Sequence, residues 1–116
     1  MLESIKKAVE RFNKLDGTIR ILTHFDADGI TAGAIFASAL KRADKQFIIT
    51  AISQLDKNHV ENLKNEEASI TVILDMGSSH LQELSSLTGN IFIIDHHEIH
   101  EMIELPQNIS FINPHL

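Results

Sequence analysis

The sequence predicts an α/β protein with a doubly wound, mostly parallel sheet and helices on both of its faces. Short apolar runs rich in β-branched residues alternate along the 116 residues with segments of helical periodicity. These runs are continuously apolar rather than alternating between apolar and polar, which is typical of strands buried on both faces. We therefore expect parallel strands that are connected by helices and covered by them.

The N-terminal half predicts two helices and two strands. Residues 2–15 carry apolar side chains at helical spacing, and the pair Asp16-Gly17 predicts the turn that ends this helix. A β-branched run predicts a strand over 18–25. A helix is expected over 29–43, with basic residues that suit its last turn, and a second strand over 46–53.

The C-terminal half continues the alternation. Asn58 and Glu61 have the spacing of a capping box in a short polar helix, and Ser79 with Gln82 has the same spacing in a later one. Gly89 is expected to stop that later helix. The expected elements are a helix over 56–67, a strand over 69–75, a helix over 78–87, and strands over 90–95 and 109–113.

Composition excludes several classes of function. The chain has no cysteine, so disulfides and thiolate metal sites are excluded. Its formal net charge of −6 does not suit a protein that holds nucleic acid by charge alone, and we expect the cationic face of the first helix to be solvated. No apolar run is long enough for a membrane helix and no signal peptide is evident, so we expect a cytoplasmic protein without a membrane partner. The residues of that cationic face are Lys6, Lys7, Arg11 and Lys14.

Carboxylates and imidazoles follow three of the predicted strands. Because parallel strands all end at the same edge of a sheet, segments distant in sequence are expected to meet there. So many acidic groups would repel one another without a cation, and aspartate with histidine suits manganese, magnesium, iron or cobalt, with room for two ions. The residues concerned are His24, Asp26, Asp28, Asp75, Asp95, His96 and His97.

Purely structural roles are the alternative for single members of this set. Asp28 or Asp75 could cap a helix, and His24 alone could be a core histidine. Asp26 has no such role that the sequence suggests, because it lies in a turn without a basic neighbour. His59 and His100 are expected to be surface residues, and His80 is expected to do no more than begin a helix.

The strand-end motifs resemble a known family. "HFDADG", "ILDMGSS" and "IIDHHE", in this order, are similar to the first three motifs of the DHH phosphoesterase superfamily. "THFDADGITAGAI" together with "FINPHL" most resembles the archaeal RecJ-like single-strand exonucleases. The resemblance covers residues 18–116.

This resemblance implies a role for each residue of the set. It implies phosphodiester hydrolysis with two manganese or magnesium ions, with Asp75 between them and His97 beside the scissile phosphate or the leaving group. Asp95 is expected to orient an imidazole, as the partners of such histidines usually do. Gly29 is expected to let the backbone bend beside the metals. The implied metal ligands are His24, Asp26, Asp28, Asp75 and His96.

The sequence also departs from the family's pattern. The resemblance implies a fourth motif with a further aspartate after "NPH" and a separate C-terminal substrate-binding domain, and neither is found within these residues. Residues 1–116 are therefore expected to be the N-terminal part of a DHH phosphoesterase domain. Single-stranded DNA or RNA, held through the remaining region, and replication or repair proteins are the expected partners.

Four other functions compete with this interpretation. "FDADGIT" resembles the motif of haloacid-dehalogenase-like phosphatases, but Ile30 stands where that motif needs threonine. A receiver domain would need a lysine after its last strand and no histidine pair. An inactive DHH-like scaffold in a replication or repair complex is a further alternative. The fourth is a DHH enzyme acting on small nucleotides or pyrophosphate.

Overall fold

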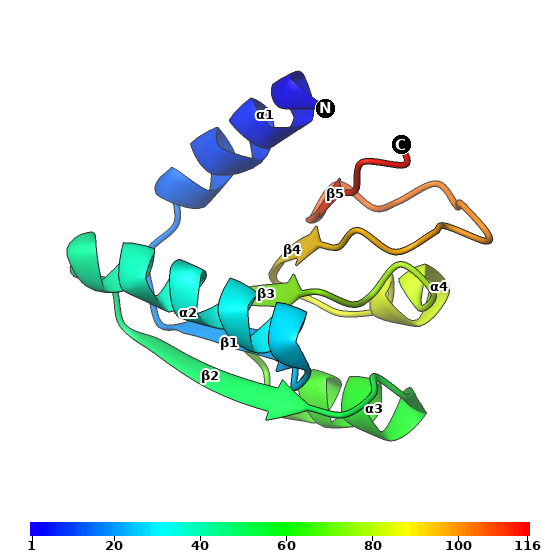
Figure 1. Ribbon diagram of the computed structural model, residues 1–116, viewed down its shortest axis with the longest axis horizontal. Coiled ribbons are helices and arrows are strands. Elements are labelled where there is room, and N and C mark those ends of the chain that lie inside the picture. The colour runs from blue at the N-terminus through cyan, green and yellow to red at the C-terminus, as the bar shows by residue number, and fades with distance from the viewer.

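The computed structural model describes all 116 residues and confirms the α/β fold (Figure 1). One five-stranded parallel sheet has the strand order β2-β1-β3-β4-β5. None of the helices has the length and apolarity that crossing a membrane requires. The helices are α1 (Leu2–Asn13), α2 (Ala27–Arg42), α3 (Lys57–Asn65) and α4 (Leu81–Leu84). The strands are β1 (Ile19–His24), β2 (Phe47–Ile52), β3 (Ile70–Leu74), β4 (Asn90–Ile94) and β5 (Ile109–Ile112).

The core lies in two layers, one on each face of the sheet. Successive residues of β3 point to opposite faces, so that Val72 packs in one layer and Ile73 in the other. Leu40 of α2 belongs to the layer of Val72, together with residues of α1. Leu63 of α3 and Leu84 of α4 belong to the layer of Ile73. The sheet is therefore doubly wound, as the sequence predicts.

Strand β2 differs from the expectation of burial on both faces. It lies at an edge of the sheet and pairs only with β1. Ile48 is 65% exposed, and Ile49 is 42% exposed although the close approach of Gly33 places α2 over it. An apolar run therefore predicted the strand correctly but not its burial, because burial depends on the position of the strand in the sheet.

Two of the predicted helix caps are wrong. Helix α3 begins after Asp56, whose carboxylate accepts a hydrogen bond from the backbone N–H of His59 at 2.9 Å, so Asn58 is not the cap. Helix α4 is limited to four residues, and the side chain of Ser79 does not cap it. The preceding residues form a turn instead, in which the backbone N–H of His80 donates to the carbonyl oxygen of Gly77 at 2.9 Å, and His80 itself has a non-helical φ of −129°.

Arg11 is not part of a solvated helix face, in contrast to the expectation. Its guanidinium donates hydrogen bonds to the carbonyl oxygens of Ile91 at 2.8 Å and Gln107 at 3.0 Å, and it lies 4.3 Å from the ring centroid of Phe92. Arg11 thus connects α1 to β4 and to the segment before β5.

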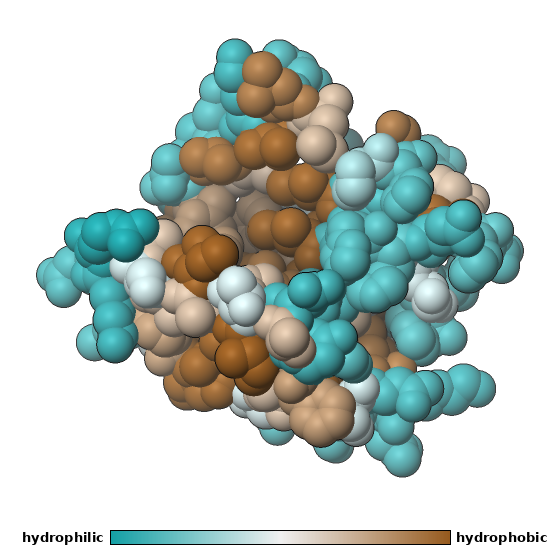
Figure 2. All heavy atoms as spheres, in the orientation of Figure 1, coloured by the Kyte–Doolittle hydropathy of each residue, from teal (hydrophilic) through white to brown (hydrophobic).

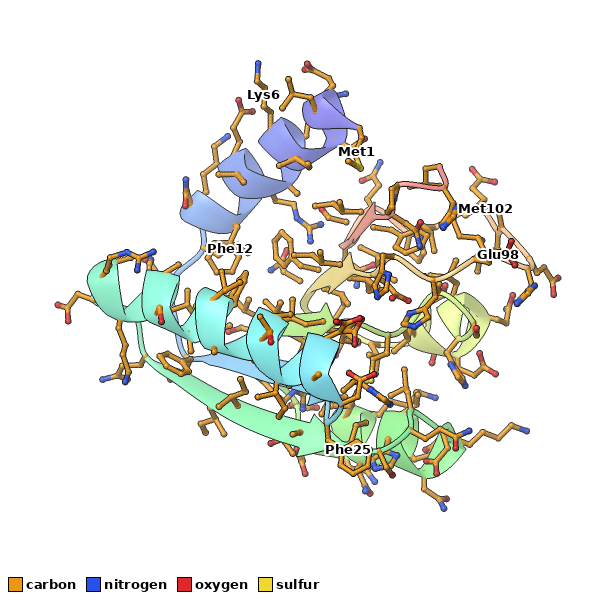
Figure 3. All side chains as sticks on the ribbon, viewed as in Figure 1. Met1, Lys6, Phe12, Phe25, Glu98 and Met102 are labelled. Atoms are coloured by element: carbon orange, nitrogen blue, oxygen red, sulfur yellow. The ribbon has the colours of Figure 1, made fainter.

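An apolar groove of about 290 Å³ lies between α1 and α2 (Figure 2). The ring of Phe12 lies at one end of α1 and packs edge-on against Phe36 and Phe92 (Figure 3). Met1 lies at the other end, where a second hollow continues toward the carboxyl ends of the strands. The second hollow therefore connects this face of the molecule with the predicted site.

Candidate metal centre

The carboxyl ends of β1, β3 and β4 lie side by side and bring all seven predicted residues to one edge. Thr23 pairs with Leu74, and Leu74 pairs with Ile94, so the residues that follow these positions are neighbours across the sheet. Asp28 lies at the margin of the group, with an exposed side chain whose Oδ2 is 3.9 Å from Nε2 of His96. The metal-binding role of the set stays a prediction.

Asp75 lies at the centre of the site. Its side chain is 4% exposed, and its Oδ1 lies 2.7 Å from Nε2 of His96. The other oxygen, Oδ2, is buried without any hydrogen-bond partner. Burial raises the pKa of this carboxyl, and the carboxylate of Asp26 also raises it. A buried carboxylate oxygen without a partner is costly, and a cation is the partner that this environment lacks.

The backbone of Asp75 has an unusual conformation. Its φ is +61°, in the left-handed region that side-chain-bearing residues rarely adopt. Aspartate and asparagine tolerate this region better than other non-glycine residues. Its N–H still donates to the carbonyl oxygen of Ile94 at 2.9 Å, so the chain turns out of β3 at this residue.

Asp26 has a structural role that the sequence did not suggest. It is the N-cap of α2, and its Oδ1 accepts a hydrogen bond from the backbone N–H of Gly29 at 2.9 Å. Its Oδ2 lies 3.0 Å from Nδ1 of His24. The Gly29 bond, followed by the His24 contact, lowers the pKa of Asp26 to about 2, and the Asp26 contact raises the pKa of His24. Asp26 is therefore ionised at neutral pH.

Gly29 is required for close approach rather than for a bend. It is a buried residue in the first turn of α2, and a Cβ atom on it would lie 1.9 Å from the carbonyl oxygen of His24. The hydroxyl of Thr23 donates to the carbonyl oxygen of Gly29 at 2.8 Å. The start of α2 is thus held directly against the end of β1, which places Asp26 beside His24.

Asp95 receives four hydrogen bonds and has little capacity left for a metal. Its Oδ1 accepts from the backbone N–H of His96 at 2.8 Å and of His97 at 3.3 Å, and lies 2.6 Å from Nδ1 of His97. Its Oδ2 accepts from the backbone N–H of Ser78 at 3.1 Å. Burial raises the pKa of Asp95, but the hydrogen bonds from Ser78 and the two histidines outweigh it and lower the pKa overall. The hydrogen bond to Asp95 raises the pKa of His97.

Two groups of donor atoms at this edge fit a divalent cation, and Asp75 belongs to both groups. His24, Asp26 and Asp75 each offer one ligand atom, and these atoms lie within 4.8 Å of one another. A second group with the same spacing contains Asp75 together with Asp95, His96 and His97. Oxygen and imidazole donors of this kind suit manganese and related ions. With its unpartnered oxygen, Asp75 has the position expected of a carboxylate between two ions.

Two hollows meet at these residues. One of about 180 Å³ contains His24 and His97, and the other of about 560 Å³ contains Asp28 and His96. Asp75 and Asp95 line both. No lysine or arginine lines either hollow, so this chain offers no cationic side chain to a phosphate there.

The smaller hollow is also lined by residues that were not predicted from the sequence. His80, expected only to begin a helix, which it does, also lines this hollow, and Ser53 and Gln54 reach it from the end of β2. Each of the three residues follows a strand that ends at this edge of the sheet, and this position in the sequence could have identified them. His100 is exposed as expected, whereas His59 is partly buried and lies 2.8 Å from the Asp56 carboxylate.

Together, the fold and the site define an α/β domain with a cluster of aspartates and histidines, which could hold a metal ion, at the carboxyl edge of its sheet. The sequence pattern of the DHH family, N-terminal domain, matches residues 18–116, and the chain therefore belongs to the DHH family. Domains of this family are in general metal-dependent phosphoesterases. The predicted superfamily is thus confirmed.

The chain is also similar to an uncharacterized protein of Methanocaldococcus jannaschii. The two are 33% identical over 120 residues, which cover 99% of this chain and 28% of that protein. The chain therefore spans less than a third of the length of this relative.

Proposed function

We propose that this chain carries the metal centre of a phosphodiesterase that removes nucleotides from single-stranded nucleic acid, in the manner of the RecJ-like exonucleases. The observation that supports this best is the buried, unpartnered Oδ2 of Asp75 amid His24, Asp26 and His96. Two manganese or magnesium ions would be held by the five predicted ligands, with Asp75 common to both. When bound, such ions polarise phosphoryl oxygens and make water more acidic.

The remaining residues act on protons and orientation. Hydrolysis forms a bond from phosphorus to a water oxygen and breaks the bond to the ester oxygen, which then needs a proton. His97 is suited to donate it from Nε2, because Asp95 holds Nδ1 at 2.6 Å and raises the pKa of the ring. His97 lines the smaller hollow, and we place the leaving group there.

A small nucleotide is a second candidate substrate. The absence of lysine and arginine from both hollows favours it, because a long strand needs cationic contacts that a short nucleotide needs less. For the exonuclease, the strand would be held by the region that lies outside the matched 28% of the Methanocaldococcus relative.

The first test is a manganese titration of the 116-residue chain by calorimetry. We expect saturable binding that is lost in the Asp28→Asn, Asp75→Asn double variant. Binding that is unchanged in the double variant would place the ion elsewhere. Absence of binding to the wild-type chain would contradict a self-sufficient metal centre and favour the scaffold alternative.

The second test compares substrates in the presence of manganese. Single-stranded oligonucleotides of DNA and RNA, a dinucleotide and pyrophosphate are offered to wild-type protein and to His97→Ala. We expect cleavage of a phosphodiester that His97→Ala loses while manganese binding is retained. Loss of binding in His97→Ala would mean that His97 is a ligand, and cleavage of pyrophosphate alone would contradict phosphodiester specificity.

A further inference from the structure

Asn113 is a buried residue that contacts the site from the end of β5. It is 1% exposed, and every polar atom of its side-chain amide is hydrogen-bonded. Its Nδ2 donates to the carbonyl oxygen of His97 and to Oγ of Ser78, each at 2.9 Å, and its Oδ1 accepts from the backbone N–H of His115 at 2.8 Å. A carbonyl can only accept and a backbone N–H can only donate, so these partners fix the orientation of the amide.

Ser78 connects Asn113 to Asp95. The Ser78 side chain is buried, and its oxygen accepts from Asn113, which leaves the hydroxyl proton free to be donated. The backbone N–H of the same residue donates to Oδ2 of Asp95 at 3.1 Å. Ser78 therefore connects Asn113, which its side chain contacts, to Asp95, which its backbone contacts.

This series of contacts ends on the His97 ring. Oδ1 of Asp95 lies 2.6 Å from Nδ1 of His97, and Asn113 independently holds the His97 carbonyl. Asn113 thus contacts the backbone of His97 directly and its ring through two intermediates. Closed networks of this kind restrict a side chain more than separate hydrogen bonds do.

We propose that Asn113 is a positioning residue for His97, which it holds, directly and through Ser78 and Asp95, with Nδ1 turned inward and Nε2 facing the smaller hollow. The importance of this arrangement for catalysis rests on the proposed function. Asn113 makes no hydrogen bond to the side chain of a predicted metal ligand and lines neither hollow, so its effect on the reaction is expected to pass through His97.

The test that does not depend on activity reads the tautomer of the His97 ring by ¹⁵N NMR of the metal-free chain, at a pH where the ring is neutral. We expect the Nδ1-protonated form to dominate in the wild-type protein and Asn113→Ala to shift the ring toward a mixture of tautomers. Asn108→Ala is the matched control, because Asn108 also donates from Nδ2 to two carbonyl oxygens, those of Leu87 and Gly89, away from the site. Unchanged His97 signals in folded Asn113→Ala would overturn the proposal.

Ser78→Ala provides a second variant if Asn113→Ala does not fold. It removes the hydroxyl link while the Asn113 bond to the His97 carbonyl remains. We expect a smaller tautomer shift in the same direction. If the His97 ring kept its wild-type signals in Ser78→Ala, Ser78 would not connect Asn113 to His97, and the proposal would be overturned.

Kinetics on a phosphodiester give the complementary readout. Asn113→Ala should lower kcat about tenfold, the lower end of the range for residues that orient a metal-binding histidine, with KM and manganese affinity little changed. In a His97→Ala background, Asn113→Ala should lower kcat no further, because both changes remove the same contribution. Independent, multiplying effects would overturn the proposal. If the wild-type chain cleaves no phosphodiester, the proposed function fails, while the NMR result still decides on the positioning of His97.

Discussion

A Cβ atom on Gly29 would lie 1.9 Å from the carbonyl oxygen of His24 and 2.5 Å from its carbonyl carbon. Both atoms belong to the backbone, so the contact cannot be relieved by a side-chain rotation. Gly29→Ala must therefore move the start of α2 away from β1. We expect a loss of about 3 kcal/mol in the free energy of unfolding, measured by urea denaturation, together with weaker manganese binding.

Gly33→Ala is the control in the same helix. Its Cβ would approach the flexible end of Ile49 at 2.9 Å, and alanine is the better helix former. We expect stability within about 1 kcal/mol of wild type and unchanged manganese binding. Equal costs for the two substitutions would show that the backbone contact at Gly29 does not limit the structure.

The effect of Asp75→Asn on stability should change sign when manganese is added. Without metal, the substitution replaces a buried carboxylate with a neutral amide that tolerates the φ of +61°, so the melting temperature should equal or exceed that of the wild type. With manganese at about 100 times its dissociation constant, the wild type should gain about 2.7 kcal/mol and the variant nothing. Thermal unfolding with and without manganese measures both effects.

Asp44→Asn is the matched control for this prediction. Asp44 is an exposed aspartate that also has a positive φ, of +56°, but it lies in the turn between α2 and β2. The control should respond to manganese as the wild type does. If Asp75→Asn responds equally, the ion does not bind at Asp75.

Asp26 should make stability dependent on pH in the acid range. Its hydrogen bond from Gly29 and its contact with His24 lower its pKa from 3.8 to about 2, below the value in the unfolded chain. A carboxyl with a lowered pKa stabilises the fold above the unfolded value, and this stabilisation is lost as the pH falls through about 2. The wild type should therefore exceed Asp26→Asn in stability above about pH 4, and the difference should shrink toward pH 2.

Urea denaturation of metal-free protein between pH 2 and 5 measures this difference. Asparagine also caps helices well, so the variant should remain folded. Burial raises the pKa of Asp75, which gives a contribution of opposite sign, but that residue is present in both proteins. Parallel stability profiles would contradict the assignment of Asp26 as an ionised cap.

The order of elements and the location of the site could be predicted from the sequence, because both follow from local patterns. Continuous apolar runs identify the strands, although not the exposure of the edge strand β2, and parallel strands place the residues after them on one edge. Asp75 and the Asp95-His96-His97 triplet could therefore be assigned to one site although more than 15 residues separate them.

The contacts that hold the site in place could not be predicted in this way. The role of Asp26 as a cap depends on the exact residue at which α2 begins. The requirement for glycine at position 29 depends on how closely that helix approaches β1. Asn113 meets Ser78 across 35 residues, through two loops that have no periodic pattern. Side-chain partners of this kind become visible only in three dimensions.

Arg11 is the strongest example of such a contact. Helical spacing places it among the cations of α1, but the structure turns its guanidinium toward the carbonyl oxygens of Ile91 and Gln107 and the ring of Phe92. Arg11→Met should therefore lower the free energy of unfolding by about 2 kcal/mol, the range for hydrogen bonds that involve a charged group. Lys7→Met, at an exposed position of the same helix, should leave it within about 0.5 kcal/mol of wild type. Urea denaturation of both variants measures the difference, and equal stabilities would mean that α1 is held to the sheet by its apolar residues alone.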